Sequence, residues 1–168
     1  MSDFAALRDF VLANRIFDSE FHGLAHWHQV ESNGLLLTPA TGADAVVVRL
    51  FALFHDCQRQ NDGADACHGP RGAVFAGKCF REGRLGITLE QFSKLSHACA
   101  FHTEEERSGD ATIDTCYDAD RLDLGRVGIS PDPAKMATVP GAKTARKALR
   151  AKIAPLGMRE WLKTLRLH

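Results

Sequence analysis

The sequence lacks most features that mark secreted, membrane-spanning or disulfide-stabilised chains. Its five cysteines are spread over 168 residues without a C-x-x-C pair, which argues against a disulfide framework and against a zinc finger. The N-terminus has no basic region followed by an apolar run, so we expect no signal peptide. The longest apolar stretch, residues 43–54, contains Asp44 and Arg49 and is too short to cross a bilayer. We therefore expect a soluble, cytoplasmic protein with no membrane partner.

Neither sign of charge is in excess over the whole chain. Lysine plus arginine number 21 and aspartate plus glutamate number 21, so the formal net charge is zero. This balance argues against nucleic acid as a partner, because nucleic-acid binders normally carry a basic excess. The net charge of zero is a cancellation between segments. Residues 104–132 carry nine acidic and three basic residues, a net charge of −6, and residues 133–168 carry nine basic and one acidic, a net charge of +8. The simplest interpretation of the basic end is a solvated helix face.

Most segments repeat apolar residues with the helical period, and strand patterns are nearly absent. Pro39 and Gly42 are expected to end the second helix, and Thr88 resembles an N-cap. Polar loops are expected over residues 58–70 and 104–110. The predicted helices cover roughly residues 4–11, 22–37, 43–55, 72–84, 88–101, 113–124 and 143–167.

The pattern predicts one all-α domain over residues 1–168. Its core would span about residues 21–138, and a basic helical C-terminal extension would span residues 143–168.

Histidine is the residue type that stands out, with seven of eight lying between His22 and His102. His55 and Asp56 are adjacent at the end of a helix that is otherwise apolar, where an ionised Asp56 would need a compensating cation. Imidazole together with carboxylate suits Mn, Fe, Co, Ni or Zn, with Mg also compatible. His22 and His26 are four residues apart and share a helix face. The sequence therefore predicts a divalent metal site.

Four pieces of sequence carry these residues: HGLAHWHQV, FALFHDCQRQNDGADACHGPRGA, HACAFHTEEE and CYDADRLDLGRVGI. In their order and spacing they resemble the HD superfamily of metal-dependent phosphohydrolases, over about residues 21–138. The resemblance implies a compact HD-type helical domain with its metal site between the central helices. It assigns the ligands to His26 on an early helix, to the pair His55 and Asp56, and to Asp120 on a later helix.

The same resemblance implies further roles. His68 and His102 would hold a second metal ion, and His22 would contact the substrate. Arg59 and Arg71 would bind phosphate oxygens, because a guanidinium can do so bidentately. Asp56 would be the central catalytic carboxylate. Asp62, with Asp65 in the same loop, would orient water or protonate a leaving group.

The predicted function is that of a metal-dependent phosphohydrolase, in which metal-activated water attacks a phosphate ester or anhydride, with a nucleotide as the expected substrate. One alternative is an HD-type di-iron oxygenase using all six ligands. Another is a non-catalytic metal-dependent sensor of a ligand or nucleic acid that uses the basic tail. Asp123 and Arg126 are expected to form an ion pair on one helix face rather than to take part in catalysis.

Overall fold

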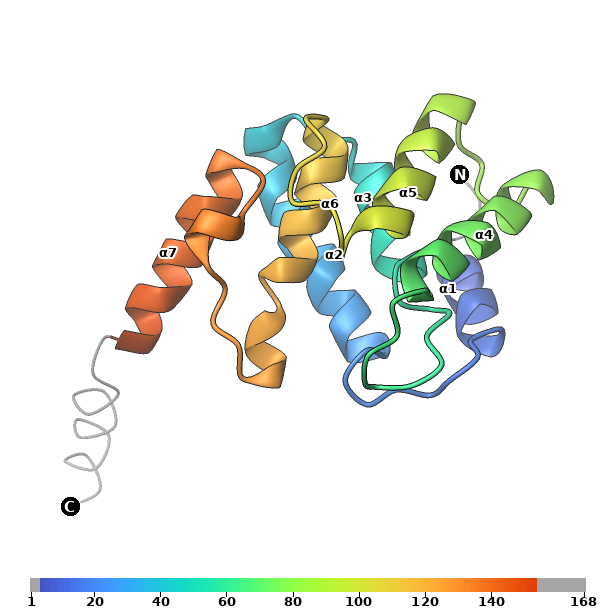
Figure 1. The fold of residues 1–168 in the computed structure, drawn as a ribbon. Helices are drawn as coiled ribbons and strands as arrows, with labels where there is room; N and C mark the ends of the chain where they lie inside the picture. The colour runs from blue at the N-terminus through green and yellow to red at the C-terminus, as the bar shows by residue number, and fades with distance from the viewer. Residues whose placement is uncertain (1–3, 154–168) are drawn as a thin grey trace, which may run out of the picture.

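The computed structural model describes residues 4–153, which form an all-helical fold without a β-strand (Figure 1). The predicted all-α class is confirmed. The end of the predicted basic extension lies outside the described residues. Two 3-10 helices, η1 (Leu124–Val127) and η2 (Pro133–Lys135), precede the last α-helix. The α-helices are α1 (Phe4–Ala13), α2 (Leu24–Thr41), α3 (Ala45–Phe54), α4 (His68–Arg81), α5 (Leu89–Phe101), α6 (Ala111–Arg121) and α7 (Val139–Ile153).

Helix α3 lies in the middle of the fold, as its almost wholly apolar sequence predicts. Asp44 caps its N-terminus, where its carboxylate accepts hydrogen bonds from the N–H groups of Val46 and Val47. Helices α1, α2, α4, α5 and α6 all contact α3. Phe51 and Phe54 are fully buried, and each contributes roughly 1.5–3 kcal/mol through its burial. The C-terminus of α3 therefore emerges among the other helices rather than at the surface.

Helix α2 is longer than predicted, because it continues through Pro39 to Thr41. A proline in a helix removes one N–H donor and leaves the carbonyl four residues earlier without its partner. Here the Thr38 hydroxyl donates to that carbonyl, Leu35 O, at 2.9 Å. The helix ends at Gly42, whose φ of 73° lies in the left-handed region that favours glycine. The prediction that Pro39 ends the helix is thus wrong, and Gly42 is the terminator.

The predicted loop over residues 58–70 is also too long, because α4 begins at His68. Pro70 lies in the first turn of α4, where the backbone N–H has no partner within the helix, so proline is tolerated there. The prediction for Thr88 is confirmed: its side chain accepts from the Gln91 N–H, and the Gln91 side chain accepts from the Thr88 N–H.

Two glycines bring the start of α4 close to the ends of α3 and α5. A Cβ atom on Gly72 would lie closer than 3.0 Å to the carbonyl oxygen of Phe54, and one on Gly69 would lie 2.5 Å from that of Cys99. These oxygens belong to the backbone and cannot rotate away. The glycines therefore set how closely α4 approaches the two helix ends.

Helix α7 lies at one edge of the fold (Figure 1) and is anchored to α6 by a buried carboxylate. Asp118 accepts hydrogen bonds from the N–H groups of Ala137 and Thr138 and from the Thr138 hydroxyl. Within the described residues, no helix combines the length and the apolar character that crossing a membrane requires.

Candidate metal centre

The metal-ligand candidates come from the ends or inner faces of five different helices. His55 is the C-cap of α3, and Asp56 follows it directly. His102 is the C-cap of α5, and His68 is the first residue of α4. His26 and Asp120 lie on α2 and α6, which pack against each other. The convergence of these elements gathers six side chains that are distant in sequence.

The first group consists of His26, His55, Asp120 and one oxygen of Asp56. The Nε2 atoms of His26 and His55 lie 3.0 Å apart. Asp120 Oδ1 lies 3.3 Å from His26 Nε2 and 3.9 Å from His55 Nε2. Asp56 Oδ2 lies 3.5 Å from each of the two Nε2 atoms. His26, His55 and Asp120 therefore form one group of possible ligands for a divalent transition metal. Asp56 Oδ2 lies beside both imidazole nitrogens of this group.

The second group consists of His68, His102 and the other oxygen of Asp56. The two Nε2 atoms lie 3.0 Å apart. Asp56 Oδ1 lies 3.2 Å from His68 Nε2 and 3.9 Å from His102 Nε2. The Asp56 carboxylate thus stands between two groups of histidines, with one oxygen directed to each.

The proton positions on three of the four histidines follow from the carbonyl oxygens that their Nδ1 atoms contact. Nδ1 of His55 contacts the carbonyls of Phe51 and Ala52, and Nδ1 of His102 contacts that of Cys99. Nδ1 of His68 contacts the carbonyl of Asp65.

A carbonyl oxygen can only accept, so each of these Nδ1 atoms donates and carries the proton of its neutral ring. Each Nε2 then keeps a lone pair. Two lone pairs 3.0 Å apart repel each other unless a cation, either a proton or a metal ion, lies between them.

In the metal-free protein a proton takes that role in the first group. Burial acts to lower the pKa of His26, but hydrogen bonds with Asp120, Asp123 and Asp56 raise it to about 10. Burial lowers the pKa of His55 to about 3, so this ring is neutral and can accept. Although burial acts to raise them, the histidines nearby hold the pKa values of Asp56 and Asp120 below the usual range for a carboxyl group. Two ionised carboxylates in a buried site require a compensating cation.

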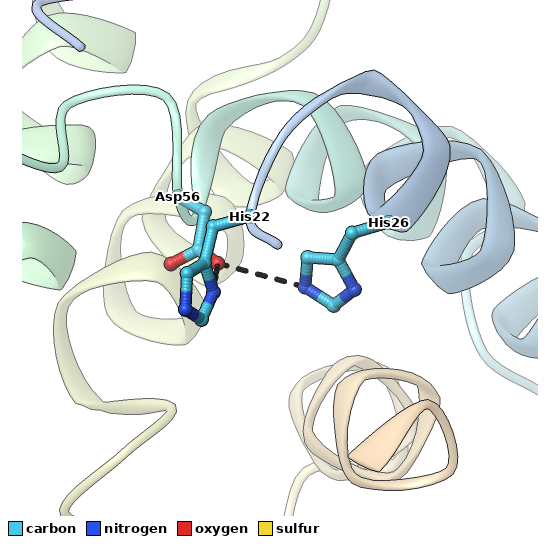
Figure 2. A group of neighbouring side chains, drawn as sticks. All are labelled: His22, His26 and Asp56. Atoms are coloured by element: carbon cyan, nitrogen blue, oxygen red, sulfur yellow. Dashed lines mark hydrogen bonds and ion pairs between the residues drawn. The ribbon is translucent and has the colours of Figure 1, made fainter. Parts of the chain in front are cut away.

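Two polar side chains, those of His22 and Arg59, border this centre. His22 Nδ1 lies 3.0 Å from Asp56 Oδ2, and Figure 2 shows His22 and His26 approaching the Asp56 carboxylate. Arg59 is buried and donates from Nη1 to Asp56 Oδ1 at 3.3 Å, while the carbonyls of Asn61 and Gly63 hold the rest of its guanidinium. His22 and Arg59 thus both contact Asp56, and their contacts with a substrate stay predictions.

Other predicted site residues lie elsewhere. Arg71 donates to Asp65 and to the carbonyl of Gln58, and it lines a separate cavity of about 480 Å³ on the outer side of α4. Asp62 is exposed and hydrogen-bonds the Ser19 hydroxyl. The structure therefore does not group these side chains with the six ligand candidates, and their roles toward phosphate or water stay predictions.

One residue of the centre has a contact that sequence reasoning missed. Asp123 forms the expected ion pair with Arg126, at 3.6 Å. Its Oδ2 also lies 2.8 Å from Nδ1 of His26. The signal that could have found this contact is the three-residue spacing between Asp120 and Asp123. Side chains three residues apart on a helical turn point to the same side.

Comparisons with known proteins define the fold class. No family model matches the chain, and no curated protein matches it. The structure nevertheless has the fold of an HD-type helical domain. It is similar to the crystal structure of a predicted HD superfamily hydrolase from an uncultured Thermotogales bacterium, with a TM-score of 0.70 and 21% sequence identity. The match covers 95% of this chain and 90% of that one. The architecture expected from the sequence motifs is thereby confirmed at the level of the fold.

Proposed function

We propose that this protein is a metal-dependent phosphohydrolase, in which a divalent cation is held by His26, His55, Asp56 and Asp120. The observation that carries the proposal is the convergence of Nε2 lone pairs and carboxylate oxygens on one buried point, with the Nδ1 protons directed away from it. His68, His102 and the second oxygen of Asp56 would hold a second cation. Mn, Fe, Co, Ni and Zn suit this donor set best.

When bound, such a cation lowers the pKa of a coordinated water and polarises a phosphoryl oxygen. The chain's own residues would supply the other requirements. The buried carboxylates neutralise the cation, and the surrounding apolar side chains exclude bulk water. The structural neighbour is described as a predicted hydrolase, and that description agrees with a hydrolytic rather than a redox role.

The cavity beside Asp56 supports a phosphate ester as the substrate. It has a volume of about 200 Å³ and is lined by Asp56, His22 and two arginines, Arg15 and Arg59. The remaining walls are mainly apolar and include Trp27, but Asp18 also lines the cavity. Arg15 pairs with Asp18 and Arg59 with Asp56, so an anionic ligand would take over guanidinium donors that these carboxylates now use.

The small volume bears on the predicted nucleotide substrate. Pockets that enclose a drug-sized ligand measure roughly 300–1,000 Å³, so a cavity of about 200 Å³ suits a compact group. We therefore propose that it encloses a small phosphomonoester or the phosphate end of a nucleotide. His22, which reaches both Asp56 and the cavity, would contact the phosphate. Asp62 contacts Ser19, which also lines the cavity. A role of Asp62 in proton transfer would therefore use the Ser19 hydroxyl as the intermediate group.

The experiment is a metal analysis followed by a hydrolysis assay. Purified protein is loaded with Mn²⁺, Co²⁺ or Zn²⁺ and assayed with p-nitrophenyl phosphate and with nucleoside monophosphates. We expect the Asp56→Ala variant to lose hydrolysis, because Asp56 stands between both groups of histidines. Asp9→Ala, on the exposed side of α1, is the matched control and should retain it. Equal hydrolysis by the wild type and Asp56→Ala would contradict the proposal.

The shared Asp56 carboxylate also fits the alternative of a di-iron oxygenase, since one oxygen faces each group. Iron as the metal found on purification, together with an oxygen-dependent absorption band and no phosphatase activity, would favour that chemistry.

A further inference from the structure

Asp123 lies behind His26, on the side of the imidazole that faces away from the other ligand candidates. Its Oδ2 lies 2.8 Å from His26 Nδ1 and connects residues that are 97 positions apart in the sequence. Both side chains are shielded from solvent, with 1% of His26 and 15% of Asp123 exposed. An ionised carboxylate can only accept, so this contact places a proton on Nδ1.

A carboxylate is needed here because His26 lacks the local acceptors that the other histidines use. His55 and His102 follow the last turns of α3 and α5, where Nδ1 reaches the carbonyls of Ala52 and Cys99, each three residues earlier. His26 lies near the start of α2. The carbonyl of Gly23 already accepts from the Trp27 N–H, and that of His22 accepts from the Trp27 indole.

Arg126 holds the Asp123 carboxylate in this position. Its Nη1 lies 3.6 Å from Asp123 Oδ2, and its Nε donates to the carbonyl of Phe21 at 2.8 Å. Its Nη2 lies 3.1 Å from His22 Nδ1. One guanidinium therefore links η1 to the segment that leads into α2, and it fixes Asp123 relative to His26.

We propose that Asp123, held by Arg126, is a positioning residue of the first metal site. It keeps the proton of neutral His26 on Nδ1, and Nε2 therefore presents its lone pair to the point that His55 and Asp120 also face. The inference rests on the proposed metal binding. Among the four histidine ligand candidates, it assigns an Nδ1 acceptor to His26, whereas the other three contact backbone carbonyls. Removing such an acceptor typically weakens metal affinity by about 10- to 100-fold.

The test measures metal affinity rather than activity. The His68→Ala background isolates the first site, and Zn²⁺ or Co²⁺ is titrated in competition with a chelating dye. We expect Asp123→Ala to weaken first-site affinity by about 10- to 100-fold and to change the Co²⁺ absorption spectrum. Asp123→Asn should weaken it by a smaller factor of at least about threefold, because an amide oxygen still accepts from Nδ1 but carries no charge. Asp9→Asn is the control.

The outcomes separate the two proposals. If His68→Ala itself binds no metal while folded, the proposed function fails, irrespective of Asp123. If it binds metal and Asp123→Ala binds equally well, the positioning role is overturned. Circular dichroism monitors folding; where Asp123→Ala does not fold, Asp123→Asn decides. An unchanged first-site affinity then overturns the proposal, and a weaker affinity with an unchanged melting temperature supports it.

Discussion

Gly72 gives a direct test of how the start of α4 is positioned against the end of α3. In Gly72→Ala, the new Cβ would lie closer than 3.0 Å to the carbonyl oxygen of Phe54 and 3.1 Å from that of His55. Because neither backbone oxygen can rotate away, α4 must shift. Overpacking of this kind costs about 1–3 kcal/mol. We therefore expect Gly72→Ala to lower the free energy of unfolding by that amount.

Gly77 on the same helix provides the matched control. A Cβ there would meet only Arg81 Nη1 at 3.4 Å and the Phe92 ring at 3.5 Å, which are ordinary contacts with side chains. Alanine in a helix is favoured over glycine by about 0.5–1 kcal/mol. The two Gly→Ala variants of one helix should therefore differ by roughly 1.5–4 kcal/mol, with Gly77→Ala the more stable.

The assay is urea unfolding of the metal-free protein, followed by circular dichroism. A second readout is metal affinity. His68 moves with α4, so the second group, His68, His102 and Asp56, should bind a metal ion more weakly in Gly72→Ala. The reasoning would be refuted if Gly72→Ala were as stable as Gly77→Ala. It would also be refuted if Gly72→Ala were destabilised but left the second site unchanged.

Two further predictions concern Asp118 and His26. Asp118→Ala removes three hydrogen bonds at the start of α7 and should lower the free energy of unfolding in urea by about 2–4 kcal/mol. The control Asp132→Ala, at an exposed 3-10 cap, should lower it by about 1 kcal/mol. Equal losses in the two variants would contradict the anchoring role of Asp118. Because the pKa of His26 is raised to about 10, a metal ion must displace a proton from it at neutral pH. Apparent first-site affinity should therefore rise by up to about tenfold per pH unit between pH 7 and 9. Affinity independent of pH in that range would show that His26 is already deprotonated.

The ligand candidates could be found from the sequence because residue type and order carry the necessary information. An ionisable pair, His55 and Asp56, at the end of an apolar helix is costly unless a cation is present, and this made the pair conspicuous. The resemblance to the HD superfamily then assigned His26 and Asp120 as the other ligands. The structure brings these side chains close together, and their role as metal ligands stays a prediction.

The residues around the ligands were harder to predict because their partners are tertiary. Arg71 was assigned to phosphate from its type alone, but it donates to Asp65 and to the Gln58 carbonyl. The start of α4 was missed because Gly69 and Pro70 usually mark loops. In this fold the close approach to Cys99 requires the glycine, and a proline in the first turn loses no hydrogen bond. Local propensity was overridden by packing at this position.

The histidines themselves show where sequence reasoning reaches its limit. For His55, His68 and His102 the Nδ1 acceptor is a carbonyl three or four residues earlier, so a histidine at a helix end carries its own orienting group. His26 follows a different rule, since its acceptor lies on a segment 97 residues away and reaches it only because α2 packs on α6. A substitution that shifts α6 against α2 should therefore disturb His26 while leaving the other three rings in place. The orientation of the His26 ring therefore depends on a tertiary contact, whereas carbonyls close by in sequence orient the rings of His55, His68 and His102.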